Sequence, residues 1–173
     1  KKVAARGADF VLKQIFEFGF FHTDPHPGNF FLLEDNVLAP LDFGQVARLS
    51  RKDTRLLNEM VLAVVEGDAE NMIAALEREN MVSERTDTEK TLRDFEQMLD
   101  TYRNLPLRDI PFNSVMSETF DIIRQNYIRP APQFTLMLKS MMTAESFATG
   151  LDPDFDIVEY LKPYAKKYSL GGF

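Results

Sequence analysis

The chain has 173 residues, of which 45% are hydrophobic and 27% are charged, the ordinary balance of a folded globular protein. Its formal net charge is -7, and the sequence contains no basic stripe of any size, so we expect no nucleic-acid partner. The absence of cysteine excludes disulfides and cysteine-ligated zinc. No apolar run reaches the roughly 18 residues of a membrane-spanning helix. We therefore expect a protein that is cytoplasmic or bound peripherally to a membrane.

The N-terminal part predicts one helix, an irregular loop and a small hairpin. Apolar residues between positions 3 and 18 recur at three- and four-residue spacing, which is typical of an amphipathic helix that ends at Gly19. From Phe20 to Asn29 two prolines and a glycine break the pattern, so no regular element is expected there. The apolar runs 30–33 and 37–41 flank a Glu-Asp-Asn turn and predict the two strands of a hairpin.

The remainder of the chain, from Ser50 onward, predicts helices only. Ser50 followed by Asp53 is a weak variant of a capping box, and Gly67 is expected to end the first of these helices. Further helices are expected from Asp68 through Leu76, Thr86 to Tyr102, Ser114 to Tyr127, Phe134 to Ala148 and Phe155 to Tyr168, with Pro163 kinking or interrupting the last. The predicted fold class is therefore mainly α with a small β-hairpin.

Three oxygen-bearing side chains around the hairpin indicate chemistry. Asp24 and Asn29 lie in the proline-rich loop, and Asp42 follows the second predicted strand. A hairpin returns the chain to its origin, so Asp42 is expected beside Asn29. A carboxylate and an amide oxygen are what hard cations such as Mg²⁺ take, with phosphate oxygens and waters as the other ligands. Asp24 would then orient an acceptor hydroxyl or a water, and Gly44 would permit the turn that aims Asp42 inward.

The order of these residues has a known counterpart. His22, Asp24, Asn29, a hairpin and then Asp42-Phe43-Gly44 resemble the catalytic loop and the metal-binding Asp of protein kinases. The longer strings His-Thr-Asp-Pro-His-Pro-Gly-Asn at 22–29 and Leu-Asp-Phe-Gly-Gln at 41–45 resemble the UbiB (AarF-type) family of atypical kinases. The resemblance implies a protein-kinase-like C-terminal lobe, part of an α+β enzyme that uses Mg²⁺ and ATP. It also implies a role in ubiquinone or prenyl-quinone lipid biosynthesis.

The same resemblance implies a role for each residue of the motif. Asp24 would be the catalytic Asp, and Asn29 and Asp42 would be the Mg²⁺ ligands. His22 would brace the Asp-Phe-Gly turn. His26 stands where ordinary protein kinases carry a lysine that contacts phosphate, so it is a candidate for nucleotide contact or for packing.

Departures from ordinary protein kinases limit what is expected. No Ala-Pro-Glu follows Gly44, and the segment before Ser50 is too short for a long activation loop, so we expect no platform for a peptide substrate. No phosphate-covering loop, small-lobe lysine or Lys-x-Gly-Gln motif is present, so we expect residues 1–173 to be one lobe of a longer enzyme and inactive alone. Within it, residues 20–45 form the catalytic segment and 50–173 a helical subdomain.

Two other functions fit the same residues. Small-molecule phosphotransferases of the aminoglycoside or choline type carry a similar loop. A catalytically inactive scaffold that binds a nucleotide or a lipid would keep the motif without turnover. The expected partners are ATP and, through the resemblance, lipids or proteins of quinone biosynthesis.

Several groups of side chains have both a structural and a functional interpretation. Aromatic and methionine side chains are interpreted as core, with a lipid-binding face as the alternative for the second group: Phe16, Phe18, Phe20 and Phe21; Phe134, Met137, Leu138, Met141 and Met142. A small basic patch, Lys162, Lys166 and Lys167, is interpreted as a solvated helix face, with contact to an anionic membrane as the alternative.

Overall fold

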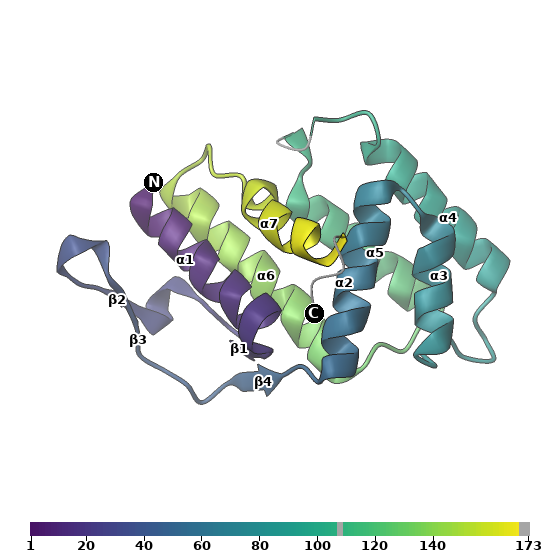
Figure 1. Ribbon diagram of the computed structural model, residues 1–173, viewed down its shortest axis with the longest axis horizontal. Helices are drawn as coiled ribbons and strands as arrows, with labels where there is room; N and C mark the ends of the chain where they lie inside the picture. Colours follow the sequence, from purple (N-terminus) through teal and green to yellow (C-terminus); the bar gives the residue numbers. More distant parts are fainter. Residues whose placement is uncertain (107–108, 170–173) are drawn as a thin grey trace.

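Helices and two small antiparallel sheets make up the computed structural model, which describes residues 1–106 and 109–169 but not the side chains of 65 and 165–169 (Figure 1). The elements are α1 (Lys2–Lys13), η1 (Gln14–Phe18), β1 (Phe20–His22), η2 (Pro27–Asn29), β2 (Phe30–Leu32), η3 (Glu34–Asn36), β3 (Leu38–Pro40), β4 (Val46–Arg48), α2 (Arg51–Glu66), α3 (Ala69–Arg78), α4 (Thr88–Tyr102), α5 (Phe112–Gln125), α6 (Pro132–Leu151) and α7 (Ile157–Ser169). The mainly helical class is confirmed. Among the described residues, none of the helices combines the length and the apolar character needed to cross a membrane.

The N-terminal helix has the apolar stripe that the spacing predicts. Ala4, Ala8 and Leu12 are fully buried, and α1 lies alongside α6 (Figure 1). Its last turn, η1, is π-helical, which the sequence pattern does not reveal. Gly19 ends it in the left-handed region with φ 58°, where a glycine avoids the strain of a side chain.

The β2–β3 hairpin also forms as predicted, with Phe30 opposite Pro40. Asp35 and Asn36 both adopt φ 58° in its turn. The Nη1 atom of Arg6 on α1 donates to both of their carbonyl oxygens at 2.6 Å. The hairpin tip is therefore tied to the first helix.

A second sheet corrects the sequence prediction. The segment from Phe20 was expected to be irregular, but β1 pairs with β4, with Phe20 opposite Arg48 and His22 opposite Val46. Three-residue strands carry too little alternation to be recognised, and the partner lies on the far side of the hairpin. The irregular loop begins only at Thr23.

The C-terminal helices follow the predicted boundaries within a few residues. The capping box is present, since Ser50 Oγ accepts from the Asp53 N–H and Asp53 Oδ2 accepts from the Ser50 N–H. Gly67 ends α2 with φ 70°, and Asp68 caps α3. Pro163 does not interrupt α7. Of the predicted basic patch, Lys162 forms an ion pair with Glu159, whereas the side chains of Lys166 and Lys167 lie outside the described part.

The core interpretation holds for the methionine-rich helix but only partly for the phenylalanines. Met137 and Met141 are buried. Phe16 and Phe21 are buried as well, but Phe18 is 71% exposed and Phe20 is 43% exposed. The core prediction for these two residues is wrong in this structure.

Candidate active site

His22 connects the two halves of the predicted motif. Its ring is buried, and Nδ1 accepts the backbone N–H of Asp24 at 3.0 Å. Nε2 lies 2.7 Å from the backbone oxygen of Asp42. An acceptor at Nδ1 and a carbonyl facing Nε2 require the neutral tautomer with its proton on Nε2. One imidazole therefore fixes the backbone of Asp24 relative to that of Asp42.

The loop after His22 closes on the backbone carbonyl of Asp24. This oxygen accepts from the His26 N–H at 2.7 Å and from Asn29 Nδ2 at 3.1 Å. Because the nitrogen end of the Asn29 amide is used in this way, its Oδ1 has no donor among the described residues. The Asp24 carboxylate is half-buried and has no hydrogen-bond partner among the described residues, so it is available to a substrate.

His26 has a local role in the same loop. Its Nδ1 accepts the Gly28 N–H at 3.1 Å, and this bond caps the short turn η2. His26 is an exposed residue, so it does not pack against other parts of the described structure. Contact with a nucleotide stays a prediction.

The hairpin returns the chain to Asn29, as expected. The Leu41 N–H donates to the Asn29 carbonyl at 2.9 Å, which places Asp42 one residue beyond this pair. Asp42 Oδ1 accepts the Gly44 N–H at 2.7 Å, and Oδ2 has no partner within the described part of the chain. A carboxylate oxygen and an amide oxygen thus stay available at neighbouring positions. This donor set fits Mg²⁺, which takes few protein oxygens and keeps phosphate and water ligands.

Gly44 serves a different purpose from the one predicted. Its φ lies outside the left-handed region that favours glycine. A Cβ at this position would instead lie 3.0 Å from Asp42 Oδ1. A side chain at position 44 would therefore require this carboxylate oxygen to shift.

The unpredicted β1–β4 sheet brings the loop and the Asp-Phe-Gly segment together. Directly after β1, the Thr23 N–H donates to the Gln45 carbonyl at 3.0 Å, and Thr23 Oγ1 donates to the same oxygen at 3.3 Å. Gln45 immediately precedes β4. The two chemical segments are consequently joined by backbone pairing as well as by His22.

Two supporting residues were missed by the sequence interpretation. Gln14 Oε1, in the π-helical turn, accepts the His22 N–H at 2.9 Å. Ser140 Oγ on α6 donates to the His22 carbonyl at 2.8 Å across 118 residues. Neither contact has a local signal, although a serine between Met137 and Met141 is the polar exception on a buried face of α6.

The site lies on an open face of the described structure. Asp42 and Gly44 are exposed; Phe43 between them is 58% exposed, and Phe31 and Leu32 in the hairpin are 60% and 57% exposed. The candidate ligands are therefore accessible rather than enclosed.

Comparison with known sequence families shows which family has this motif. The sequence of the ABC1 atypical kinase-like domain matches residues 1–76, and that of the UbiB helical domain matches residues 95–156. The chain belongs to the ABC1/UbiB atypical kinase-like family. The resemblance inferred from the motif is thereby confirmed. All five candidate site residues lie within the first match.

Curated relatives of the ABC1/UbiB family match nearly the whole chain. It is 33% identical over 164 residues to Protein ACTIVITY OF BC1 COMPLEX KINASE 1, chloroplastic, of Arabidopsis thaliana, covering 95% of this chain and 24% of that protein. It is 31% identical over 172 residues to a probable protein kinase UbiB of Shewanella oneidensis, covering 97% and 31%. An uncharacterized protein in the hydrogenase 1 5' region of Clostridium pasteurianum is 32% identical over 161 residues, covering 93% and 30%. The chain thus spans less than a third of these relatives.

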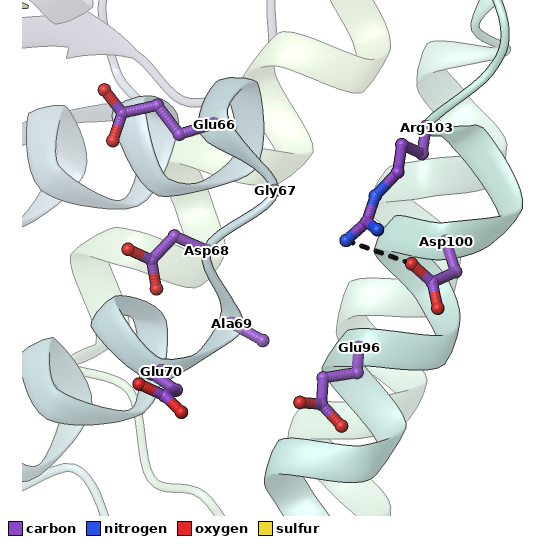
Figure 2. A pocket seen from close by; sticks show the side chains of 8 residues that line it. All are labelled: Glu66, Gly67, Asp68, Ala69, Glu70, Glu96, Asp100 and Arg103. Atoms are coloured by element: carbon purple, nitrogen blue, oxygen red, sulfur yellow. Dashed lines mark ion pairs between the residues drawn. The ribbon is translucent and has the colours of Figure 1, made fainter.

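An acidic cleft lies elsewhere, between the α2–α3 junction and α4 (Figure 2). Three of its polar side chains have structural roles, since Asp68 caps α3 and Asp100 pairs with Arg103 at 3.1 Å. None of the residues of the ABC1/UbiB motif lines this cleft. The candidate site therefore lies at the loop and the hairpin and not in this cleft.

Proposed function

We propose that the intact protein is a UbiB-like atypical kinase or ATPase that uses Mg-ATP, and that this chain forms its kinase-like C-terminal lobe. The observation that carries the proposal is the double connection of the motif. His22 joins the backbones of Asp24 and Asp42, and the Leu41–Asn29 pair brings the hairpin back to the loop. Three oxygen donors required for phosphoryl transfer thus lie on one connected frame.

Each free oxygen has a place in this chemistry. Asn29 Oδ1 and the Asp42 carboxylate would hold Mg²⁺, which when bound neutralises charge on the phosphates. The unpartnered Asp24 carboxylate would orient an acceptor hydroxyl or a water and accept its proton. His22 would keep Asp24 and Asp42 in register. His26 is the exposed candidate for contact with the nucleotide.

The residues after Gly44 favour a small or lipid acceptor over a peptide. Gln45 is bonded to Thr23, β4 is paired with β1, and Ser50 already caps α2. This continuous bonding leaves no loop that could form a peptide platform. We propose that the activity supports ubiquinone or prenyl-quinone lipid biosynthesis, at a membrane that the protein contacts peripherally.

The decisive experiment is Mg²⁺-dependent ATP hydrolysis by the full-length protein, with and without lipid vesicles, beside Asp42→Asn. Asp35→Asn is a matched control, because Asp35 is an exposed carboxylate in the same hairpin and asparagine tolerates its positive φ. We expect turnover that Asp42→Asn abolishes and Asp35→Asn preserves.

Other outcomes would redirect the proposal. Nucleotide binding that Asp42→Asn weakens, without any turnover in the wild type, would favour the inactive scaffold. Turnover stimulated by aminoglycosides or choline in an acceptor screen, rather than by lipid, would favour a small-molecule phosphotransferase.

A further inference from the structure

One face of α6 carries three contacts at equal spacing. Gln133, Ser140 and Phe147 are seven residues apart, and seven residues bring an α-helix back to nearly the same side. The three side chains therefore form a single stripe, about 21 Å long at 1.5 Å per residue. Each of them contacts a different part of the chain.

The three contacts frame the candidate active site. Gln133 Nε2 donates to Asp53 Oδ1 at 3.0 Å, at the start of α2. Ser140 Oγ donates to the carbonyl of His22 at 2.8 Å. The ring of Phe147 stacks on Phe30, with centroids 6.1 Å apart and an interplanar angle of 17°.

Each partner adjoins a segment with a proposed role. Phe30 directly follows Asn29, and His22 lies two residues before Asp24. Asp53 belongs to the capping box that begins α2 after β4. One stripe thus reaches the hairpin, the catalytic loop and the end of the segment that follows Asp-Phe-Gly.

The helix is well placed to hold these positions. It lies against α1, α5 and β4 (Figure 1). Gly7 lets α1 approach it, since a Cβ there would lie 2.5 Å from the Phe147 ring. Ser140 is fully buried, so losing its hydroxyl would leave the His22 carbonyl without that donor in a place that water does not reach.

The contacts of the stripe connect the two regions of the chain that match different sequence families. Its three residues lie within the match to the UbiB helical domain, 95–156, and their partners lie within the match to the ABC1 kinase-like domain, 1–76. We propose that α6 of the helical domain is the positioning element of the active site, and that Ser140 is a positioning residue that holds the catalytic loop through the His22 carbonyl. This inference rests on the proposed phosphoryl-transfer function for its kinetic consequences. A displacement of α6 would be transmitted directly to Asp24.

The test compares Ser140→Ala with Thr91→Val in the full-length protein. Thr91 on α4 is also fully buried, and its Oγ1 donates to the Asp87 carbonyl at 2.7 Å, far along the chain from the loop. Both variants remove one buried hydroxyl. The measurements are kcat and KM for ATP, the melting temperature, and amide hydrogen exchange over residues 20–29.

We expect Ser140→Ala to lower kcat by roughly 10- to 100-fold, because small misplacements of a catalytic group have effects of this size. The KM for ATP should change little, and exchange over 20–29 should become faster. Thr91→Val should lower the melting temperature comparably without altering kcat or loop exchange.

Gln133→Ala is a second variant, at a half-buried position. We expect it to lower kcat less than Ser140→Ala and to speed exchange at residues 50–56. Wild-type kcat and loop exchange in Ser140→Ala would overturn the inference, as would an equal kcat loss in Thr91→Val. If the wild type shows no turnover, the proposed function fails, but loop exchange in the two variants still decides the structural inference.

Discussion

The segment from β1 to β4 and the helices α3 to α5 are stabilised in different ways. In the first, His22, Thr23 and Asn29 hold short strands and a loop through bonds from side chain to backbone, and much of the hairpin is exposed. In the second, fully or nearly buried residues such as Met72 and Phe95 form a continuous apolar cluster.

The first region therefore determines the geometry of the candidate site, and the second contributes more to the stability of the fold. Directional bonds set the positions of Asp24 and Asp42 but bury little apolar surface, whereas the helices bury much surface and contain none of the candidate catalytic groups. Polar substitutions should therefore matter most for activity in the first region. Cavities should matter most for stability in the second.

Asp24→Asn should show the largest effect. It keeps the size of the side chain but removes the base, so we expect turnover to fall by about 10²- to 10⁴-fold. The melting temperature should stay unchanged, because the carboxylate has no partner among the described residues. ATP hydrolysis and calorimetry on the full-length protein measure both. A large loss of stability would contradict the assignment of different roles to the two regions.

Phe95→Ala tests the opposite region. The Phe95 ring is fully buried on α4, and its removal should cost about 3–5 kcal/mol in the free energy of unfolding, because a cavity remains. Turnover per folded molecule should be preserved. Urea denaturation gives the comparison, with the exposed neighbour Glu96→Ala as the control, expected within about 0.5 kcal/mol of wild type.

Ser50→Ala tests the N-cap of α2, the helix between the two regions. Removing the N-cap of α2 should lower stability by about 1 kcal/mol, because the Asp53 N–H loses its acceptor. Ser117→Ala, at an exposed position inside α5, should leave stability within a few tenths of a kcal/mol. The denaturant midpoints of the two variants measure the difference in stability. Equal shifts would show that the capping box contributes nothing specific.

Tyr102 should give the smallest effect, visible only in alkali. Burial, aided by its bond to the Glu118 carboxylate, raises the pKa of Tyr102 to about 12 from its ordinary value of 10.0. A pKa that is higher in the folded state means that the contribution to stability is complete below pH 10 and is lost as the pH rises through 12. The size is limited because the group is partly solvated.

The measurement is the free energy of unfolding between pH 8 and 12 for the wild type and Tyr102→Phe. We expect the wild type to lose more stability over this range than the variant. Parallel curves would rule out the linkage to Tyr102.

The helix ends and the hairpin were predictable because their signals are local. Gly19 and Gly67 mark helix ends, and Ser50 and Asp68 cap the helices that follow them. The hairpin depends on two apolar runs around one turn. These features involve residues within a few positions of each other, so the pattern itself contains the physical cause.

The order of residues in the motif was likewise sufficient for the family, and the return of the hairpin placed Asp42 near Asn29. The order of residues did not reveal which contacts hold the catalytic loop and the Asp-Phe-Gly segment together. The β1–β4 pairing depends on three-residue strands, too short for a periodic signal, and the exposure of Phe18 and Phe20 was not predicted either.

The sequence alone predicted the helical class, most element boundaries, the family and the candidate catalytic groups. Only the tertiary structure decided that Gln14 and Ser140 hold the backbone of His22, and that one stripe of α6 reaches loop, hairpin and α2. The physical reason is distance along the chain. A hydrogen bond across 118 residues leaves no periodicity, and depends on how every intervening helix packs.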